Sequence, residues 1–263
     1  TMNFPYHPFL VHFPIAFLLG AFLLQGVHLY KSNWICRVVG MWLLGFASFF
    51  SIFAAITGQW ELTKAGVIGY DMKVLGSILN MINRGVREGK DDFHTMIFSN
   101  LQDNKDESRC VILRNFDREQ KLLIFNTDIR SPKGAAIRKN PETQCLFYSF
   151  REKTQLRIST ESTVHYNDDL HRIGWNKTAV SSRKCYLTKY KPSQYIETMD
   201  DGIPNHLIGR IPTSDESQPG KINFAVISNR IISIDWLYLS SKGHNRARYD
   251  FNNGSIKKSW LAP

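Results

Sequence analysis

The stretch from Arg109 to Lys133 holds the side chains of this sequence that are best suited to chemistry. It reads R-C-V-I-L-R from Arg109 to Arg114 and continues, after a turn, as L-I-F-N-T-D-I-R-S-P-K. The second run ends at a turn rich in hydroxyl and cationic groups, namely Thr127, Arg130, Ser131 and Lys133. Such groups bind phosphate, and the free backbone N–H groups at the start of a helix do the same. The segment therefore predicts a phosphate cradle.

The elements around this cradle are predicted to be short antiparallel strands. Alternating or β-branched runs occupy 110–114, 122–126, 144–150, 154–165, 222–228, 231–239 and 246–251, whereas helical patches occur only at 132–139 and 168–177. Residues 198–221 are rich in Asp, Gly, Pro and Ser and predict a long surface loop, which is either functional or an idle insertion. This pattern predicts a mainly β fold, an antiparallel barrel with flanking helices.

The first 66 residues have a different composition. Residues 9–30 and 38–57 contain no Asp, Glu, Lys or Arg, and each run meets the length of about 20 residues that a membrane-spanning helix needs. The polar turn K-S-N-W-I-C-R lies between them. A pair of buried core helices would also fit, but a transmembrane hairpin fits better. We therefore expect two domains, a helical hairpin at 1–66 and a β domain at 67–263, which begins with a helical pattern at 68–88.

The charge of the chain is concentrated in the second domain. Of the formal net charge of +10, residues 1–66 carry +2 and residues 67–263 carry the remaining +8. A basic balance fits an anionic ligand, a membrane surface or nucleic acid, or simply a solvated basic surface. The four scattered cysteines form no C-x-x-C pair and predict neither a disulfide framework nor a metal site.

Several motifs of residues 73–263 resemble the pyridoxamine 5′-phosphate oxidase-like flavoproteins, which bind FMN in a split β-barrel. H-T-M-I-F-S-N-L from His94 to Leu101 is similar to the family's first strand, and Arg109 and Arg114 bracket the second. K-N-P, from Lys139 to Pro141, ends the following helix as in the family, and T-Q-L-R is similar to a glutamine-containing strand. D-W-L-Y-L-S-S-K-G-H-N-R is similar to a late segment that carries a Trp and an Arg.

The resemblance implies FMN as the cofactor, and it implies a homodimer with residues from both subunits at each site. The implied cofactor-binding residues are Arg109, Arg114, Thr127, Arg130, Ser131, Lys133, Gln155, Trp236 and Arg246. In this reading Gln155 hydrogen-bonds the flavin, while Trp236 and Arg246 reach the flavin of the partner subunit. The family's S-R-K is S-P-K here, so one phosphate-binding arginine is lost, and Arg130 is the candidate to replace it.

Substrate recognition departs further from the family. Arg114 takes the place of a substrate-binding lysine, and a tyrosine–arginine pair cannot be placed in H-R-I-G-W-N-K-T. Lys242 and His244 stand where substrate-contacting residues lie in the family, so these two and Arg114 are the only candidates for a catalytic role. The small-molecule substrate itself is unknown.

The opening H-P-F-L-V-H-F-P, from His7 to Pro14, resembles an uncharacterised family of small bacterial membrane proteins with about four spans, of which residues 3–64 hold two. His7 and His12 lie about 140° apart around a helix, which argues against a shared haem or metal site. The resemblances together imply a bacterial inner-membrane protein. Lys31 and Arg37 favour a cytoplasmic inter-helix loop, but a flavin domain favours a cytoplasmic C-terminal side, and we expect the latter.

Three functions remain open from the sequence. The first is an FMN-dependent oxidoreductase, an oxidase-like enzyme tethered to a membrane. The second is a flavin-binding or flavin-storing module without turnover, and the third is a basic interaction domain with a vestigial site. The combined motifs favour the first and do not favour nucleic acid as a partner.

Overall fold

The computed structural model describes residues 6–32, 34–252 and 255–263, with the side chains of 6–13, 53 and 56–72 left out of the description. The chain divides into two compact units, Thr1–Leu75 and Gly76–Pro263. The boundary lies inside a long helix, C-terminal to the boundary expected at 66/67.

The first unit is built from two apolar helices, α1 (Tyr6–Lys31) and most of α2 (Trp34–Arg87). The stretches Pro14–Lys31 and Trp34–Ile52 are long and apolar enough to cross a membrane. Small residues lie between the helices, because Ala21 and Ala47 are buried, whereas Phe22 and Leu29 are 78% and 83% exposed. Apolar side chains directed outward suit a lipid environment and not an aqueous one.

Helix α2 differs from the expected pair of separate helices. The structure has one continuous helix where the sequence suggested a hairpin at 1–66 and a new helix at 68–88. Residues 58–69 contain no proline, and their glycines cost a helix only about 1 kcal/mol each. The side chains of His7 and His12, and the G-Q-W-E stretch from Gly58 to Glu61, lie outside the described side chains.

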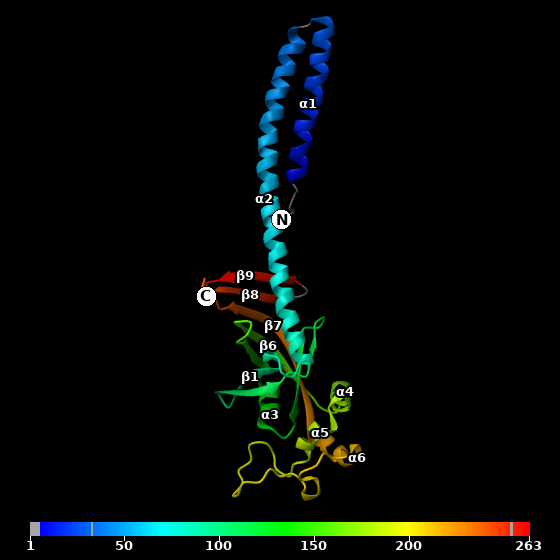
Figure 1. The fold of residues 1–263 in the computed structure, drawn as a ribbon, viewed down its shortest axis with the longest axis vertical. Helices are drawn as coiled ribbons and strands as arrows, with labels where there is room; N and C mark the ends of the chain where they lie inside the picture. The colour runs from blue at the N-terminus through cyan, green and yellow to red at the C-terminus, as the bar shows by residue number, and fades with distance from the viewer. Residues whose placement is uncertain (1–5, 33, 253–254) are drawn as a thin grey trace. The chain divides into compact units, whose positions relative to one another are not determined.

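The second unit is a nine-stranded antiparallel sheet with short flanking helices (Figure 1). The strand order is β2-β1-β5-β6-β7-β4-β3, and β8 pairs with β7 and β9. The strands are β1 (Thr95–Gln102), β2 (Lys105–Ile112), β3 (Asn115–Asp117), β4 (Leu122–Asp128), β5 (Glu142–Ser149), β6 (Thr154–His165), β7 (Phe224–Tyr238), β8 (Asn245–Asn252) and β9 (Ser255–Leu261). The helices after β4 are α3 (Pro132–Lys139), α4 (Asp169–Lys177), α5 (Val180–Arg183) and α6 (Ser214–Ser217). The predicted mainly β class is confirmed.

The alternating runs form strands because their apolar side chains pack together in the core. Phe98 of β1 and Phe125 of β4 are fully buried with their ring centroids 4.9 Å apart. A second group, in which Trp175 of α4 packs on Phe224 and Val226 of β7, joins α4 to the sheet. Gly174 permits this approach, because a Cβ atom there would lie 2.6 Å from Val226 Cγ2.

Three strand predictions need correction. Strand β2 starts at Lys105 and not at 110, so Arg109 lies inside it and Arg114 lies beyond its end. The runs 222–228 and 231–239 form the single strand β7, because the polar I-S-N-R segment is hydrogen-bonded within the sheet: Asn229 donates to Leu123 O and accepts from Ser162 Oγ. Strand β9 was missed, since S-I-K-K-S-W-L lacks an apolar alternation.

Candidate functional site

The predicted phosphate cradle lies where β4 turns into α3. Thr127 is near the end of β4, Ser131 is the N-cap of α3, and Lys133 is in its first turn. Pro132 occupies the first helical position, which suits proline because its fixed φ fits and no N–H is needed there. Lys133 Nζ donates a 2.8 Å hydrogen bond to Thr127 Oγ1. Two of the predicted ligands therefore converge, and Ser131 starts the helix beside them.

Arg109 adds a second partly buried cation to this cradle. Burial and the positive charge of Arg109 together lower the pKa of Lys133 to about 8, with Asp128 acting in the opposite direction. Burial also lowers the pKa of Arg109. Its guanidinium donates to Asn100 Oδ1, and its ion pair is with the half-exposed Glu107 at 3.7 Å. Each positive charge disfavours the protonated form of the other group, so an anion bound between the two would be stabilised by both.

Arg130, the candidate replacement for the lost arginine, is engaged elsewhere in the structure. It forms a forked ion pair with Asp128, with Nη2 2.6 Å from Asp128 Oδ2, and it donates to Thr188 O at 3.1 Å. The contact ties the cradle turn to the irregular segment after α5. Attraction to Asp128 raises the pKa of Arg130, and the guanidinium remains charged.

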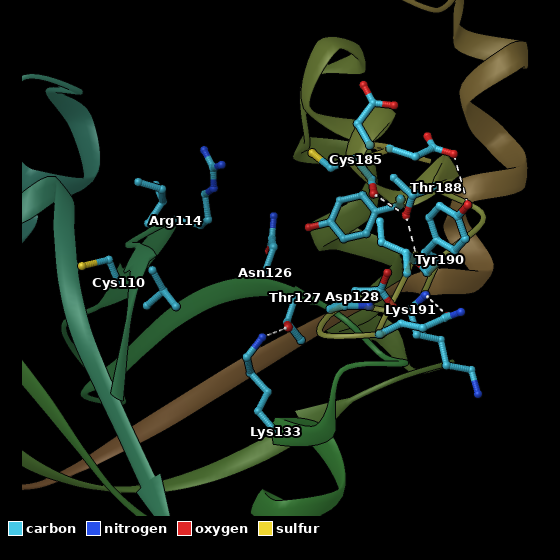
Figure 2. A pocket seen from close by; sticks show the side chains of 18 residues that line it. Cys110, Arg114, Asn126, Thr127, Asp128, Lys133, Cys185, Thr188, Tyr190 and Lys191 are labelled. Atoms are coloured by element: carbon cyan, nitrogen blue, oxygen red, sulfur yellow. Dashed lines mark hydrogen bonds between the residues drawn. The ribbon is translucent and has the colours of Figure 1, made fainter. Parts of the chain in front are cut away.

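A cavity of about 530 Å³ opens beside the cradle (Figure 2). Figure 2 shows the end of β2 on one side and the segment around Thr188 on the other, with Thr127 and Lys133 between them. Its lining includes Cys110, Arg114, Asn126, Thr127, Asp128, Lys133, Cys185, Tyr186, Tyr190, Lys191 and Asp200. The volume falls in the range of about 300–1,000 Å³ that is usual for small-molecule and cofactor sites.

The other predicted ligands lie away from this cavity within the described chain. Gln155 of β6 pairs in register with Tyr148 and Leu237. Trp236 of β7 is 8% exposed and stacks on Tyr238 with ring centroids 6.3 Å apart. Arg246 of β8 forms an ion pair with Asp235 at 2.8 Å. None of these three lines the cavity in the part of the chain that the structure describes. Of the other predicted ligands, Arg114, Thr127 and Lys133 line it, whereas Arg109, Arg130 and Ser131 lie behind its described lining.

Lys242 and His244 lie in the exposed turn between β7 and β8. His244 Nδ1 accepts a hydrogen bond from Ser240 N, and Lys242 N donates to Ser240 Oγ. Neither residue is among the described residues that line the cavity, whereas Arg114 is.

Sequence reasoning missed the contribution of residues 185–201. Tyr186, Tyr190 and Lys191 line the cavity, although the predicted loop began only at 198. The missed signal is the K-Y-K-P-S sequence, whose proline and serine indicate an irregular segment.

A serine–histidine–aspartate chain of hydrogen bonds was also missed. His165 bonds Ser228 Oγ and Asp168 Oδ2, both at 2.8 Å. Ser228 is only 6% exposed, and Asp168 also caps α4 by accepting from His171 N. We interpret this chain as a link that fixes the start of α4 to the sheet.

Two family profiles match the chain. Residues 3–83 match a family described as predicted membrane protein (DUF2231), and residues 77–166 match the FMN-binding domain of pyridoxamine 5′-phosphate oxidase. No curated protein sequence matches significantly.

Solved structures share the fold of the second unit. A pyridoxamine 5′-phosphate oxidase-related, FMN-binding protein from Nostoc punctiforme PCC 73102 is 21% identical, with a TM-score of 0.56 over 72% of this chain and 96% of that chain. PhzG from Burkholderia lata 383, solved with tetrahydrophenazine-1-carboxylic acid, is 15% identical, with a TM-score of 0.51 over 74% of this chain and 92% of that chain.

At these identities the structural similarities establish the fold alone, and the profile match adds the domain type. The chain therefore joins a region that matches a predicted membrane-protein family to a domain of the pyridoxamine 5′-phosphate oxidase FMN-binding type, and FMN is the cofactor that these matches support.

Proposed function

We propose that this protein is a membrane-tethered FMN-dependent oxidoreductase. The observation that carries the proposal is the cradle of Lys133, Thr127 and Arg109, in which the charge of one partly buried cation lowers the pKa of the other, while the nearby carboxylates of Glu107 and Asp128 are paired with Arg109 and Arg130. A phosphate group of FMN supplies the missing negative charge. The apolar helices α1 and α2 tether the domain, and we expect its flavin site to face the cytoplasm of a bacterial inner membrane.

The residues of the chain have distinct tasks in this proposal. Lys133, Arg109 and the hydroxyls of Thr127 and Ser131 bind the phosphate, and the 530 Å³ cavity beside them holds the rest of the cofactor. Arg114 and Asn126 lie at its edge, where a substrate would meet the flavin. FMN supplies hydride transfer when bound, and the protein supplies binding, orientation and exclusion of water.

Two copies of the chain are part of the proposal. Trp236 and Arg246 do not line the cavity of their own chain in the part that the structure describes, and we propose that they reach the flavin of a second subunit, while Gln155 hydrogen-bonds the flavin. The support is the domain type together with their placement outside the cavity. Lys242 and His244, in the turn next to Arg246, would then approach the partner's site.

The test is an absorbance spectrum of the detergent-purified full chain. We expect a yellow protein with flavin absorbance, or a colourless protein that becomes yellow after incubation with FMN. A protein that stays colourless and fails to bind FMN would overturn the proposal. Bleaching of the bound flavin by an electron donor such as NADPH, and recovery in air, distinguishes an enzyme from a storage module.

A further inference from the structure

Residues 189–202 form a closed loop beside the flavin cavity, drawn in yellow after α5 in Figure 1. The two ends of the loop are joined, because Lys189 N donates to Gly202 O at 3.0 Å and Lys189 Nζ lies 2.7 Å from Asp200 Oδ2. Tyr190 Oη donates to the same carboxylate at 3.1 Å, and Gly202 N donates to Asp200 Oδ1 at 2.8 Å. A surface loop whose ends meet in this way is an Ω-loop, and such loops frequently have a function.

The base of this loop has a fixed shape. Gly202 has a φ of +68°, and a Cβ atom there would lie 2.8 Å from Tyr190 Cδ2, so the position requires glycine. Thr188 Oγ1 donates to Tyr190 O at 3.2 Å, and Thr188 O accepts from Arg130 of the cradle turn at 3.1 Å. The base is therefore tied to the turn that carries the phosphate cradle.

The tip of the loop presents apolar side chains to solvent. Tyr195 and Met199 are fully exposed, at 100% and 105%, and Ile196 is 39% exposed. In the part of the chain that the structure describes, residues 192–199 form hydrogen bonds only with Lys191. Few contacts hold the tip in place, so it can move about the fixed base at a low cost in free energy. Burial of its apolar side chains would favour such a movement.

The loop already forms one wall of the flavin cavity, and Figure 2 shows Tyr190 and Lys191 on this wall. Ile196 of the tip belongs to the same lining. Lys191 is accompanied there by Asp200 and Asp201, so the loop contributes no excess of positive charge. The cradle on the other side is the better place for a phosphate, and the uncharged flavin ring is the part of FMN left to the loop.

We propose that the 189–202 loop is a lid that closes over bound FMN. The tip moves toward the cavity and buries Tyr195, Ile196 and Met199 against the cofactor, while the contacts of Asp200 keep the base in place. The closed lid slows the release of FMN and excludes water from the flavin ring. The inference rests on the proposed FMN-dependent function and gives a role to the start of the surface loop that the sequence predicts at 198–221.

The first test is hydrogen–deuterium exchange of the full chain in detergent, with and without FMN. We expect the backbone amides of residues 192–199 to exchange about tenfold more slowly when FMN is bound, because the closed tip is shielded from solvent. Residues 208–211 are the internal control. They include Ile208 and Ile211, which are 64% and 65% exposed, and they are not among the described residues that line the cavity, so their exchange should stay unchanged.

The second test removes the aromatic side chain of the tip. Tyr195→Ser changes a fully exposed position, so the fold of the free protein should be retained. We expect the dissociation rate of FMN to rise about tenfold, because the variant loses an aromatic contact with the cofactor. The rate is measured by the recovery of free-flavin fluorescence after dilution. Ile211→Ser, an exposed apolar position outside the described lining of the cavity, is the matched control and should release FMN at the rate of the parent protein.

A third variant loosens the base of the lid. Asp200→Asn keeps the size of the side chain and removes the charge that pairs with Lys189. We expect FMN to dissociate about threefold faster, a smaller effect than that of Tyr195→Ser, because an ion pair at the surface contributes little.

The outcomes separate the lid from the flavin proposal. Unchanged exchange of residues 192–199 on FMN binding overturns the lid even when the protein is yellow. A dissociation rate in Tyr195→Ser that equals that of the parent protein, or that rises equally in Ile211→Ser, overturns it as well. A chain that binds no FMN overturns the flavin proposal and the lid together.

Discussion

Two groups of cations in the β domain differ in how their charge is balanced. Arg157 and Arg246 both bond to Asp235, with Arg157 Nη2 2.6 Å and Arg246 Nη2 2.8 Å from its Oδ2. Arg109 and Lys133 instead repel one another, and the nearest carboxylate to Arg109 in an ion pair is the half-exposed Glu107. Both cations of the first group are hydrogen-bonded to a carboxylate, whereas Lys133 of the second group forms no ion pair in the part of the chain that the structure describes and bonds only a hydroxyl.

The difference indicates which group is prepared for an external anion. A cation that is already paired with a carboxylate must exchange that carboxylate for the ligand. One ion pair then replaces another, so the net gain in binding free energy is small. A cation held near another cation gains from any anion that enters, because the anion removes the repulsion as well as adding its own attraction. The cradle is therefore expected to contribute most of the affinity for FMN.

The largest expected effect comes from removing a cradle cation. We expect Lys133→Ala and Arg109→Ala each to raise the Kd for FMN by about 10- to 100-fold, because a hydrogen bond to a charged group contributes about 1.5–3 kcal/mol. Fluorescence titration of FMN measures this change. Lys139→Ala, on the exposed end of the same helix, is the control and should have no effect. Unchanged affinity in both cradle variants would show that the phosphate binds elsewhere.

A smaller effect on FMN binding is expected from the two arginines that bond to Asp235. Arg246→Ala should raise the Kd for FMN about tenfold if its side chain reaches the flavin of a second subunit. Arg157→Ala removes a cation from the same carboxylate and should change the Kd by about twofold or less. Equal responses of the two variants would argue against a direct role of Arg246. Analytical ultracentrifugation in detergent checks that both variants keep the oligomeric state of the parent protein.

The pH dependence of FMN binding gives a third, weaker test. The pKa of Lys133 is about 8, and a bound anion is expected to raise it, because an opposite charge favours the protonated form. Above this pH Lys133 loses its proton and no longer attracts the FMN phosphate. The Kd for FMN should therefore rise with pH, by about fourfold between pH 7 and 8.5. In Lys133→Ala this rise should be absent. A Kd that falls over the same range has the wrong sign for this model of the site.

The smallest effect concerns stability. Asp235→Asn leaves Arg157 and Arg246 without a carboxylate, and we expect it to destabilise the domain by about 1 kcal/mol, since both arginines are partly exposed to water. For a domain of this size the Tm should fall by about 2–4 °C. Differential scanning fluorimetry measures the change, and Glu142→Gln, an exposed carboxylate at the start of β5, serves as the control.

Local signals in the sequence were sufficient for much of the fold and part of the site. The helix at 132–139 was predicted with its observed ends, because proline fits the first position and Asn140 closes the last turn. The convergence of Thr127 and Lys133 followed from their spacing across a strand end and a helix start.

Features that depend on long-range contacts could not be predicted. The partnership of Arg130 with Asp128 and Thr188 requires the segment after α5 to pack on the cradle, a separation of 58 residues between Arg130 and Thr188. The polar I-S-N-R stretch became part of β7 only because Leu123 and Ser162 satisfy Asn229 from neighbouring strands.

Strand β7 has a consequence for how the site can be assembled. Its N-terminal half pairs with the cradle strand, where Val226 faces Asn126, and its C-terminal half carries Trp236. At about 3.3 Å per residue these two positions are at most about 33 Å apart along the strand, which bends at the register shift between Ile231 and Ser233. Under the proposed two-subunit site, the fraction of chains that bind FMN then depends on the fraction of chains that have dimerised. For copies confined to a membrane, that number follows their density in the plane of the bilayer.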